Sequence, residues 1–282
     1  AIKPDIIYCS ISGYGQQGPM AGKGAYDGAI QAASGMMSVT GTPDSGPLRV
    51  GYMPVDISTG ITASYAIASA LFRRSHSGEG QHLDVAMLDS AMTMLNPVIS
   101  NYLNGDVIPE RLGNASPTYQ GSADTWPTKD GHVQMTVITN SMTQKLCDAL
   151  GRPEWMDDPR FATDQGRVDH QVEVYDSIGA VFASEPTKHW MQVLGDAGIP
   201  IAPVHSVPQL MDFPQLDHRG VLMTMAAPAG MEGNITVPGA GFHASNGEPA
   251  AKTAAPTLGQ HTDEVLGELG YDAAAIAALR ER

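Results

Sequence analysis

The first candidate for chemistry is a glycine cluster near the start of the chain. The segment Ile6–Ser12 is typical of a buried strand, and it runs into Gly13-x-Gly15-x-x-Gly18, the spacing of a dinucleotide-binding turn. A nicotinamide site also needs a helix that opens on these glycines and an acid about 20 positions later, after a second strand. Pro19 falls where that helix should begin, and no acid follows a strand at the required distance. The cluster therefore does not predict an NAD site.

The second candidate is Asp56, the one charged residue in the stretch Val50–Tyr65. The segment that follows, Ile57–Arg74, carries almost no charge until its C-terminal arginine pair, which indicates a buried helix. An acid directly before a helix is typical of an N-cap, worth about 1 kcal/mol. The same position also suits a carboxylate nucleophile or base beside the positive end of the helix. The residues alone leave both interpretations open.

A phenol and a carboxylate, Tyr26 and Asp27, open another predicted helix, which runs to Gly41. The pair could line a pocket, but a first-turn acid beside a half-buried tyrosine is the ordinary interpretation.

Metal sites and serine hydrolase sites are not favoured by the sequence. The nine histidines show no HxxxH motif and no pair with an acid at ligand spacing, so no metal site is predicted. The nucleophile elbow G-x-S-x-G is absent.

Charge and cysteine content narrow the class of protein. Lys and Arg number 16 against 30 Asp and Glu, a formal charge of −14, so neither nucleic acid nor an anionic membrane surface is an expected partner. Cys9 and Cys147 lie far apart and suggest no disulfide framework, which fits a reducing cytoplasm. No apolar run is expected to reach the roughly 18 residues of a membrane span. We therefore expect a cytoplasmic protein without a membrane segment.

The order of predicted elements indicates layered α/β architecture. The strand at 6–12 is followed by helices at 26–41 and 57–74, and the alternating segment Gln81–Met87 predicts a second strand. A polar loop, Pro109–Pro127, carries several glycines and prolines and predicts a domain boundary.

Four segments together resemble the class III CoA-transferase family, which includes formyl-CoA transferase and L-carnitine CoA-transferase. They are "KPDIIYCSISGYGQQGP", "AYDGAIQAASGMMSVTGTPDSGPLRVG", "PVDISTGITASYAIASALFRRSHSGEGQHLDVAMLD" and "APTLGQHTDEVLGELGY". The likeness is collinear from Ile6 to about Leu279. It implies that the glycines after the first strand form a turn of that family.

The resemblance implies a fold and an assembly. The fold is α/β, with a partial Rossmann-like large domain at 1–109, an inserted small α+β domain at 110–205, and a C-terminal return to the large domain at 206–282. Family members form interlocked homodimers. They also carry a further mononucleotide-like half that supplies most contacts to the CoA adenine and phosphates, so this chain is expected to be truncated at its N-terminus.

The resemblance also implies a site. Asp56 falls on the catalytic aspartate, which attacks an acyl-CoA thioester to form a mixed anhydride and then an aspartyl-CoA thioester that passes CoA to a small carboxylic acid. Tyr26 is expected beside the thioester, Asp27 as a pocket carboxylate and Met87 near bound CoA. Gly121 is the one glycine that matches the family's glycine-rich flap. CoA is a substrate, and no tightly bound cofactor or metal is implied.

Two alternatives follow from departures from the family pattern. Related α-methylacyl-CoA racemases share the fold and the aspartate, so a 2-methylacyl-CoA racemase or epimerase remains open. They pair the aspartate with a histidine where Tyr26 stands here, and this difference favours transfer. The expected loss of the N-terminal half leaves an inactive fragment open as well. The segment "NASPTYQGSAD" replaces the flap, so the acyl donor and acceptor are not identified.

Overall fold

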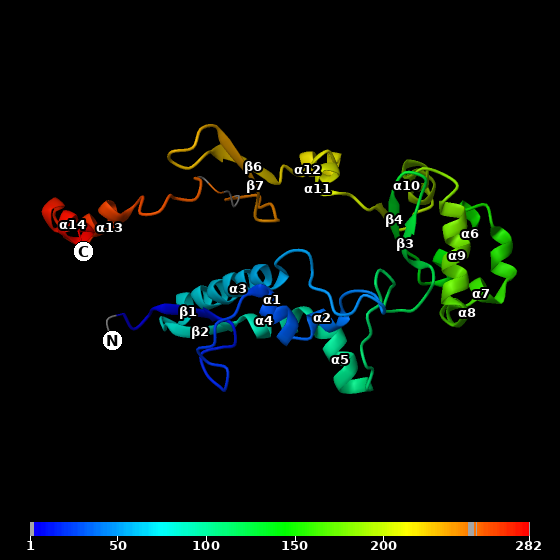
Figure 1. The fold of residues 1–282 in the computed structure, drawn as a ribbon, viewed down its shortest axis with the longest axis horizontal. Helices are drawn as coiled ribbons and strands as arrows, with labels where there is room; N and C mark the ends of the chain where they lie inside the picture. The colour runs from blue at the N-terminus through cyan, green and yellow to red at the C-terminus, as the bar shows by residue number, and fades with distance from the viewer. Residues whose placement is uncertain (1–2, 248–250, 252, 282) are drawn as a thin grey trace. The chain divides into compact units, whose positions relative to one another are not determined.

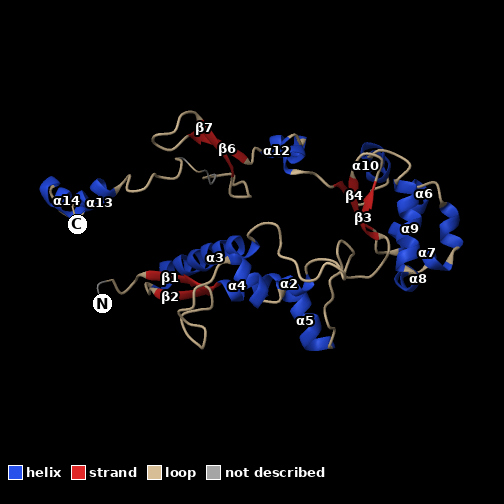
Figure 2. Cartoon of the chain, in the orientation of Figure 1, coloured by secondary structure: helices blue, strands red, loops and turns tan. Residues whose placement is uncertain are grey.

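A computed structural model describes residues 3–247, 251 and 253–281. The chain is a mixed α/β protein of two compact units, Ala1–Pro203 and Val204–Arg282, and each is described by itself (Figure 1; Figure 2). The expected three-part division at 109/110 and 205/206 stays a prediction.

The first unit begins with a parallel strand pair and the helices that connect it. These elements are β1 (Ile7–Ser12), α1 (Asp27–Ala33), α2 (Met36–Val39), α3 (Pro54–Ser77), β2 (Gln81–Ala86), α4 (Met87–Met94) and α5 (Asn96–Gly105). Strands β1 and β2 pair in register from Ile7↔Gln81 to Ser12↔Ala86. Parallel strands need a long crossover, which α1 to α3 supply. Helix α3 lies along the pair and contacts both strands and α4 (Figure 1).

Two helices that the sequence pattern predicts as continuous are interrupted. The segment predicted as one helix at 26–41 breaks at Gly35, whose φ of +88° is left-handed and ends α1 before Met36 begins α2. Residues 88–103, whose pattern also predicts one helix, are interrupted at Leu95, and Pro97 enters the first turn of α5. A proline there is compatible with a new helix, since first-turn amides have no intrahelical partner.

A small core joins α1, α2, α3 and α4. Its buried members, here called the α1/α3/α4 cluster, are Ile30, Met36, Val55, Ala91 and Leu95. Ile30 lies in the first turn of α1 and Val55 in the first turn of α3, and both are fully buried. Burying two such side chains stabilises the contact by roughly 1.5–3 kcal/mol each. The cluster therefore brings the N-termini of α1 and α3 together.

Helix α3 is long and apolar enough to cross a membrane by length and composition, so the expectation that no segment reaches this limit is wrong. Only 22% of its most apolar window is buried in the chain. Ile57, Ile61 and Tyr65 stand exposed at a spacing of four residues, one above another on the same face. One helix of this kind is weak evidence for a membrane, and the cytoplasmic location stays a prediction.

The rest of the first unit is an antiparallel sheet covered by helices. The strand order in this sheet is β3-β4-β5. The aromatic core includes Trp126, Phe182 and Trp190. The ring of Phe182 packs edge-to-face on both tryptophans, with ring centroids 5.5 Å from Trp126 and 5.3 Å from Trp190. The elements are β3 (Ala123–Pro127), β4 (His132–Thr136), α6 (Asn140–Ala149), η1 (Pro153–Asp157), α7 (Pro159–Ala162), α8 (Asp164–Asp169), α9 (Gln171–Phe182), α10 (Thr187–Asp196) and β5 (Ile201–Pro203). Strand β3 lies inside residues 109–127, so the prediction of a loop is wrong for its last five residues.

The second unit contains an antiparallel hairpin between short helices (Figure 2). Strands β6 and β7 pair from Leu222↔Pro238 to Ala226↔Asn234. The elements are α11 (Val207–Met211), α12 (Pro214–Arg219), β6 (Leu222–Ala226), β7 (Asn234–Pro238), α13 (Thr262–Glu268) and α14 (Ala273–Arg280).

The two cysteines should differ sharply in reactivity. Burial in α6, with a smaller contribution from Asp148, raises the pKa of Cys147 to about 11. At pH 8 about one Cys147 in a thousand is then a thiolate, the form that reacts. In the folded protein a thiol reagent should label the partly exposed Cys9 well before Cys147, and urea should equalise the two. Peptide mass spectrometry over a labelling time course measures this, and equal rates in the folded state would contradict the burial.

Candidate functional site

Asp56 lies inside the first turn of α3 and is not its N-cap. The helix begins at Pro54, and the N-cap position belongs to Met53, which makes no side-chain capping bond. The expectation that Asp56 caps the helix is therefore wrong. Its exposed carboxylate stays next to the positive end of a 24-residue helix, where the helix dipole stabilises negative charge.

The capping bonds of α3 come from a different helix. Asp27 is only 5% exposed, and its Oδ2 accepts hydrogen bonds from the backbone N–H of Val55 at 2.9 Å and of Asp56 at 3.2 Å. The next amide, Ile57, donates to the carbonyl of Met53 at 3.2 Å, and Pro54 has no N–H. The bond of Ile57 is the first of the helix's own ladder, whereas a helix by itself leaves the amides of Val55 and Asp56 without partners. Here Asp27 satisfies both of them.

Gln31 holds Asp27 in this position. Its Nε2 donates to Asp27 Oδ1 at 2.5 Å, and its Oε1 accepts from the backbone N–H of Val50 at 2.9 Å. Gln31 is fully buried. We call the hydrogen-bonded set Asp27, Gln31, Val50, Val55 and Asp56 the carboxylate clasp. The sequence interpretation missed Gln31, although its spacing of four residues from Asp27 on a predicted helix was a usable signal.

The clasp leaves the side chain of Asp56 unengaged. In the part of the chain that the structure describes, no group donates a hydrogen bond to the Asp56 carboxylate and no cation pairs with it. An aspartate side chain can hydrogen-bond to its own or a neighbouring backbone amide. Asp27 occupies the amides of Asp56 and Val55, and the Asp56 carboxylate accepts no hydrogen bond, so both of its oxygens remain available to a substrate.

Tyr26 occupies the N-cap position of α1 and its side chain is 87% exposed. The expectation of a half-buried tyrosine is therefore wrong. Its backbone carbonyl accepts from the amides of Ala29 and Ile30. Because Tyr26 directly precedes Asp27, its backbone is adjacent to the clasp. The expected position of its ring beside a thioester stays a prediction.

Met87 is the first residue of α4 and packs, partly buried, against the α1/α3/α4 cluster. It therefore shares the core that joins the N-termini of α1 and α3. Its expected contact with CoA stays a prediction.

Gly121 is buried against α9, and packing explains its identity. A Cβ at this position would lie 2.1 Å from the carbonyl oxygen of Gln171 and 3.0 Å from the Cβ of Val174. Its amide donates to the carbonyl of Arg167 at 3.3 Å. Arg167 is itself buried, with Nη1 donating to the carbonyl of Phe161 at 2.6 Å. The expected binding role of Gly121 stays a prediction, whereas its need to lack a side chain follows from this contact.

The glycine cluster after β1 is held by the protein itself. Gly15 has a φ of +90°, and its amide donates to Ser12 Oγ at 3.0 Å. The amide of Gln16 donates to Asp84 Oδ2, in β2, at 2.8 Å. A Cβ on Gly13 would lie 2.5 Å from the Cβ of Ala25. Turn conformation and close packing thus account for Gly13 and Gly15.

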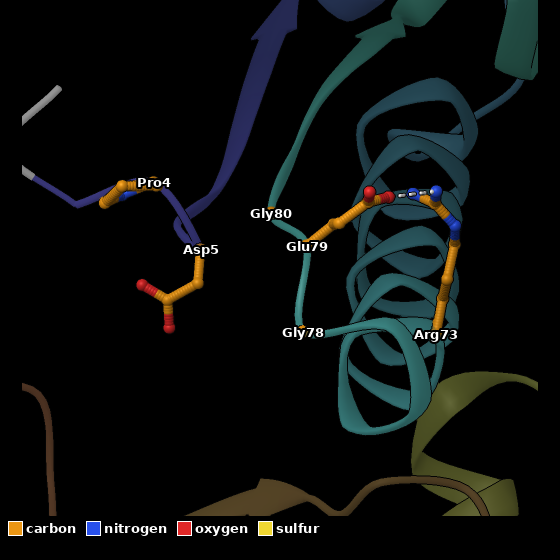
Figure 3. Close-up of a pocket in the computed structure, with 6 residues that line it drawn as sticks. All are labelled: Pro4, Asp5, Arg73, Gly78, Glu79 and Gly80. Atoms are coloured by element: carbon orange, nitrogen blue, oxygen red, sulfur yellow. Dashed lines mark hydrogen bonds and ion pairs between the residues drawn. The ribbon is translucent and has the colours of Figure 1, made fainter.

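An open pocket lies at the other end of α3. It has a volume of about 650 Å³ and is lined by Pro4, Asp5, Arg73, Gly78, Glu79 and Gly80 (Figure 3). Two of the lining residues, Arg73 and Glu79, form an ion pair at 3.0 Å (Figure 3). At 1.5 Å per residue, Arg73 lies about 25 Å along the helix from Asp56. This pocket is therefore separate from the candidate nucleophile. Among the residues that the structure describes, no group of three metal-ligating side chains is found.

The family model of CoA-transferase family III matches residues 1–262. The chain belongs to this family. Succinyl-CoA:glutarate CoA-transferase of Mus musculus is 36% identical over 282 residues, covering 99% of this chain and 63% of that protein. Succinate–glutarate CoA-transferase of Agrobacterium fabrum is 35% identical over 270 residues, covering 95% and 66%. A CAIB/BAIF family protein from Brucella suis has a TM-score of 0.80 at 31% identity, covering 94% of this chain and 68% of that one.

This family III chain spans less than two thirds of the length of those two curated relatives. The comparisons support the family and the mixed α/β fold. The activity, substrates and dimeric assembly of the whole protein belong to the proposals below.

The packing role of Gly121 can be tested by its stability effect. Gly121→Ala should lower the free energy of unfolding by about 1–3 kcal/mol, because the added methyl group overpacks a buried site. Gly195→Ala, on an exposed turn of α10 where a Cβ meets nothing within 4 Å, is the matched control. It should be neutral or stabilising by up to about 1 kcal/mol. Urea unfolding measures both, and equal midpoints would contradict the packing account.

Proposed function

We propose that the protein transfers CoA from an acyl-CoA donor to a carboxylic acid acceptor, with Asp56 as the nucleophile. The observation that carries the proposal is the exposed, unbonded carboxylate of Asp56 on a first turn whose amides are all satisfied. The names of the relatives support dicarboxylic substrates, since they mention succinyl-CoA and glutarate, and a further relative from Acetobacter aceti, 32% identical, is named acetyl-CoA:oxalate CoA-transferase.

The first half of the reaction loads CoA onto the enzyme. An Asp56 oxygen attacks the thioester carbonyl carbon, the C–S bond breaks, and CoA leaves as the thiolate, giving a mixed anhydride. The thiolate then attacks the Asp56 carbonyl carbon of the anhydride. The bond between that carbon and the bridging oxygen breaks, so the donor leaves as a free carboxylate that keeps this oxygen, and an aspartyl-CoA thioester remains.

The second half repeats these steps with the acceptor. Its carboxylate attacks the aspartyl thioester, CoA thiolate leaves, and a new anhydride forms between Asp56 and the acceptor. The thiolate attacks the acceptor carbonyl, which yields acceptor-CoA and regenerates the Asp56 carboxylate. No net proton or electron is required. Holding the reactants at near-attack distance supplies much of the rate.

The tetrahedral intermediates need donors for their oxyanion. The first-turn amides of α3 cannot supply them, because Val55 and Asp56 donate to Asp27 and Ile57 donates to Met53. The oxyanion donors must therefore come from outside this turn. The positive end of the helix still favours the negative charge that gathers there.

Replacing the nucleophile should abolish the reaction. Asp56→Asn keeps the shape of the side chain and removes its nucleophilic oxygen, so CoA transfer should fall at least about 10³-fold. The assay supplies succinyl-CoA with glutarate, and acetyl-CoA with oxalate, and quantifies the product thioesters by mass spectrometry. The matched control is Asp89→Asn, which alters an exposed first-turn aspartate of α4. Retained turnover in Asp56→Asn would refute the proposal.

The covalent intermediate offers a second test that separates the alternatives. After incubation with donor, hydroxylamine should trap Asp56 as a hydroxamate, located by peptide mass spectrometry. Deuterium entering the α-carbon of a 2-methylacyl-CoA in heavy water, without such an adduct, would favour the racemase. Neither adduct nor exchange, together with no binding of CoA by calorimetry, would favour the inactive fragment.

A further inference from the structure

We propose that Asp27 and Gln31 are positioning residues: the clasp takes over the capping of α3 and thereby keeps the Asp56 carboxylate free to act as nucleophile. This inference rests on the proposed function. It adds that Asp27 and Asp56 act together, because Asp27 caps α3 and Asp56 is thereby left free to react. Asp27 is assigned no contact with substrate in this role.

The clasp follows from one face of α1. Asp27, Ile30 and Gln31 are spaced by three and four residues, which places them on the same side of a helix. Ile30 and Val55 are both buried in the α1/α3/α4 cluster, so the packing of α1 against α3 that buries them also brings Asp27 to the amide of Val55. Apolar packing thus brings α1 close to the N-terminus of α3, and the Asp27 carboxylate then bonds to the amides there.

Gln31 determines which oxygen of Asp27 faces the helix. Its amide group is engaged at both ends, by Asp27 Oδ1 and by the Val50 amide. Turning the amide over would place its NH₂ against the Val50 N–H, leaving both donors unpaired in a buried site, which is costly. The orientation of Gln31 is therefore defined, and Asp27 Oδ2 is directed to the two amides of α3.

The consequence for Asp56 is chemical. Without the clasp, the amides of Val55 and Asp56 would lack partners, and the Asp56 carboxylate, carried on the same turn, is an acceptor that can fold back onto its own amide. A carboxylate that accepts such bonds is a weaker nucleophile and points at its own helix. With the clasp, Asp56 stays exposed and unbonded.

The test uses variants of Gln31 and one matched control. Gln31→Met keeps the length of the side chain and removes both polar ends. Asp27→Asn is the second variant, should the first fail to fold. The control is Gln144→Met, because Gln144 donates to Asp148 at 3.0 Å in a pair of the same spacing on the exposed surface of α6.

Two measurements test whether the clasp is formed without relying on turnover. Hydrogen exchange should show the amides of Val55 and Asp56 protected in the wild-type protein and in Gln144→Met, and exposed in Gln31→Met. Labelling of Asp56 with a water-soluble carbodiimide and an amine should slow in Gln31→Met, since its carboxylate is then drawn to the freed amides. Unchanged exchange or unchanged labelling in Gln31→Met would overturn the proposal.

Turnover provides the third measurement. In Gln31→Met, kcat should fall roughly 10- to 100-fold, the usual effect of a misplaced reacting group, with little change in KM for the acyl-CoA. Gln31→Glu should recover relative activity as the pH falls toward about 5, because a protonated carboxyl can donate to Asp27 while accepting from Val50. If the clasp only stabilised the fold, Gln31→Met would lower the stability of the protein without lowering kcat, and Gln31→Glu would show no recovery at acid pH. That result would also overturn the proposal.

The outcomes keep the two proposals apart. If the wild-type protein forms no adduct at Asp56 with any donor, the proposed function fails, while exchange and carbodiimide labelling still decide whether the clasp frees that carboxylate. If the wild-type protein transfers CoA and Gln31→Met does so at the wild-type rate, the function stands and the positioning role is refuted.

Discussion

The arrangement around Asp56 depends on one buried carboxylate. Asp27 sits on α1, is nearly inaccessible, and accepts the amides that open α3. A buried charge is tolerated only when its lone pairs are engaged, and here Gln31 and two amides engage them. The positive end of α3 favours the same charge. Burial, hydrogen bonding and the helix dipole therefore all act on a single side chain, and they fix the turn that carries the candidate nucleophile.

Asp27 and Asp56, 29 positions apart, therefore have different roles. Asp27 is buried and fully bonded, so it is suited to holding a helix and unsuited to attacking a substrate. Asp56 is exposed and unbonded, so it is suited to attack. The same division removes the first-turn amides of α3 as oxyanion donors, because they are already used. Stabilisation of a tetrahedral intermediate must then be supplied by groups outside this turn.

Several elements could be predicted because their signals are local. The strands at 7–12 and 81–86 alternate or cluster apolar residues as expected. Strand β3 was missed because its short sequence, ADTWP, sits among turn residues and is stabilised by pairing with β4 and by the burial of Trp126. The break between α1 and α2 was missed because a helical pattern continues through Gly35, whose left-handed backbone ends the helix.

The amino-acid sequence by itself determined the family resemblance, the position of Asp56 near the start of a long apolar helix, and the spacing that puts Asp27 and Gln31 on one helical face. Only the tertiary structure decided which acid caps which helix. Local pattern favoured Asp56 as the cap of its own helix, since a cap normally lies beside the amides it serves. The actual cap comes from a residue 28 positions before Val55. Its reach depends on the packing of α1 and α3 in the α1/α3/α4 cluster, which includes Ile30 and Val55 and which no local pattern specifies.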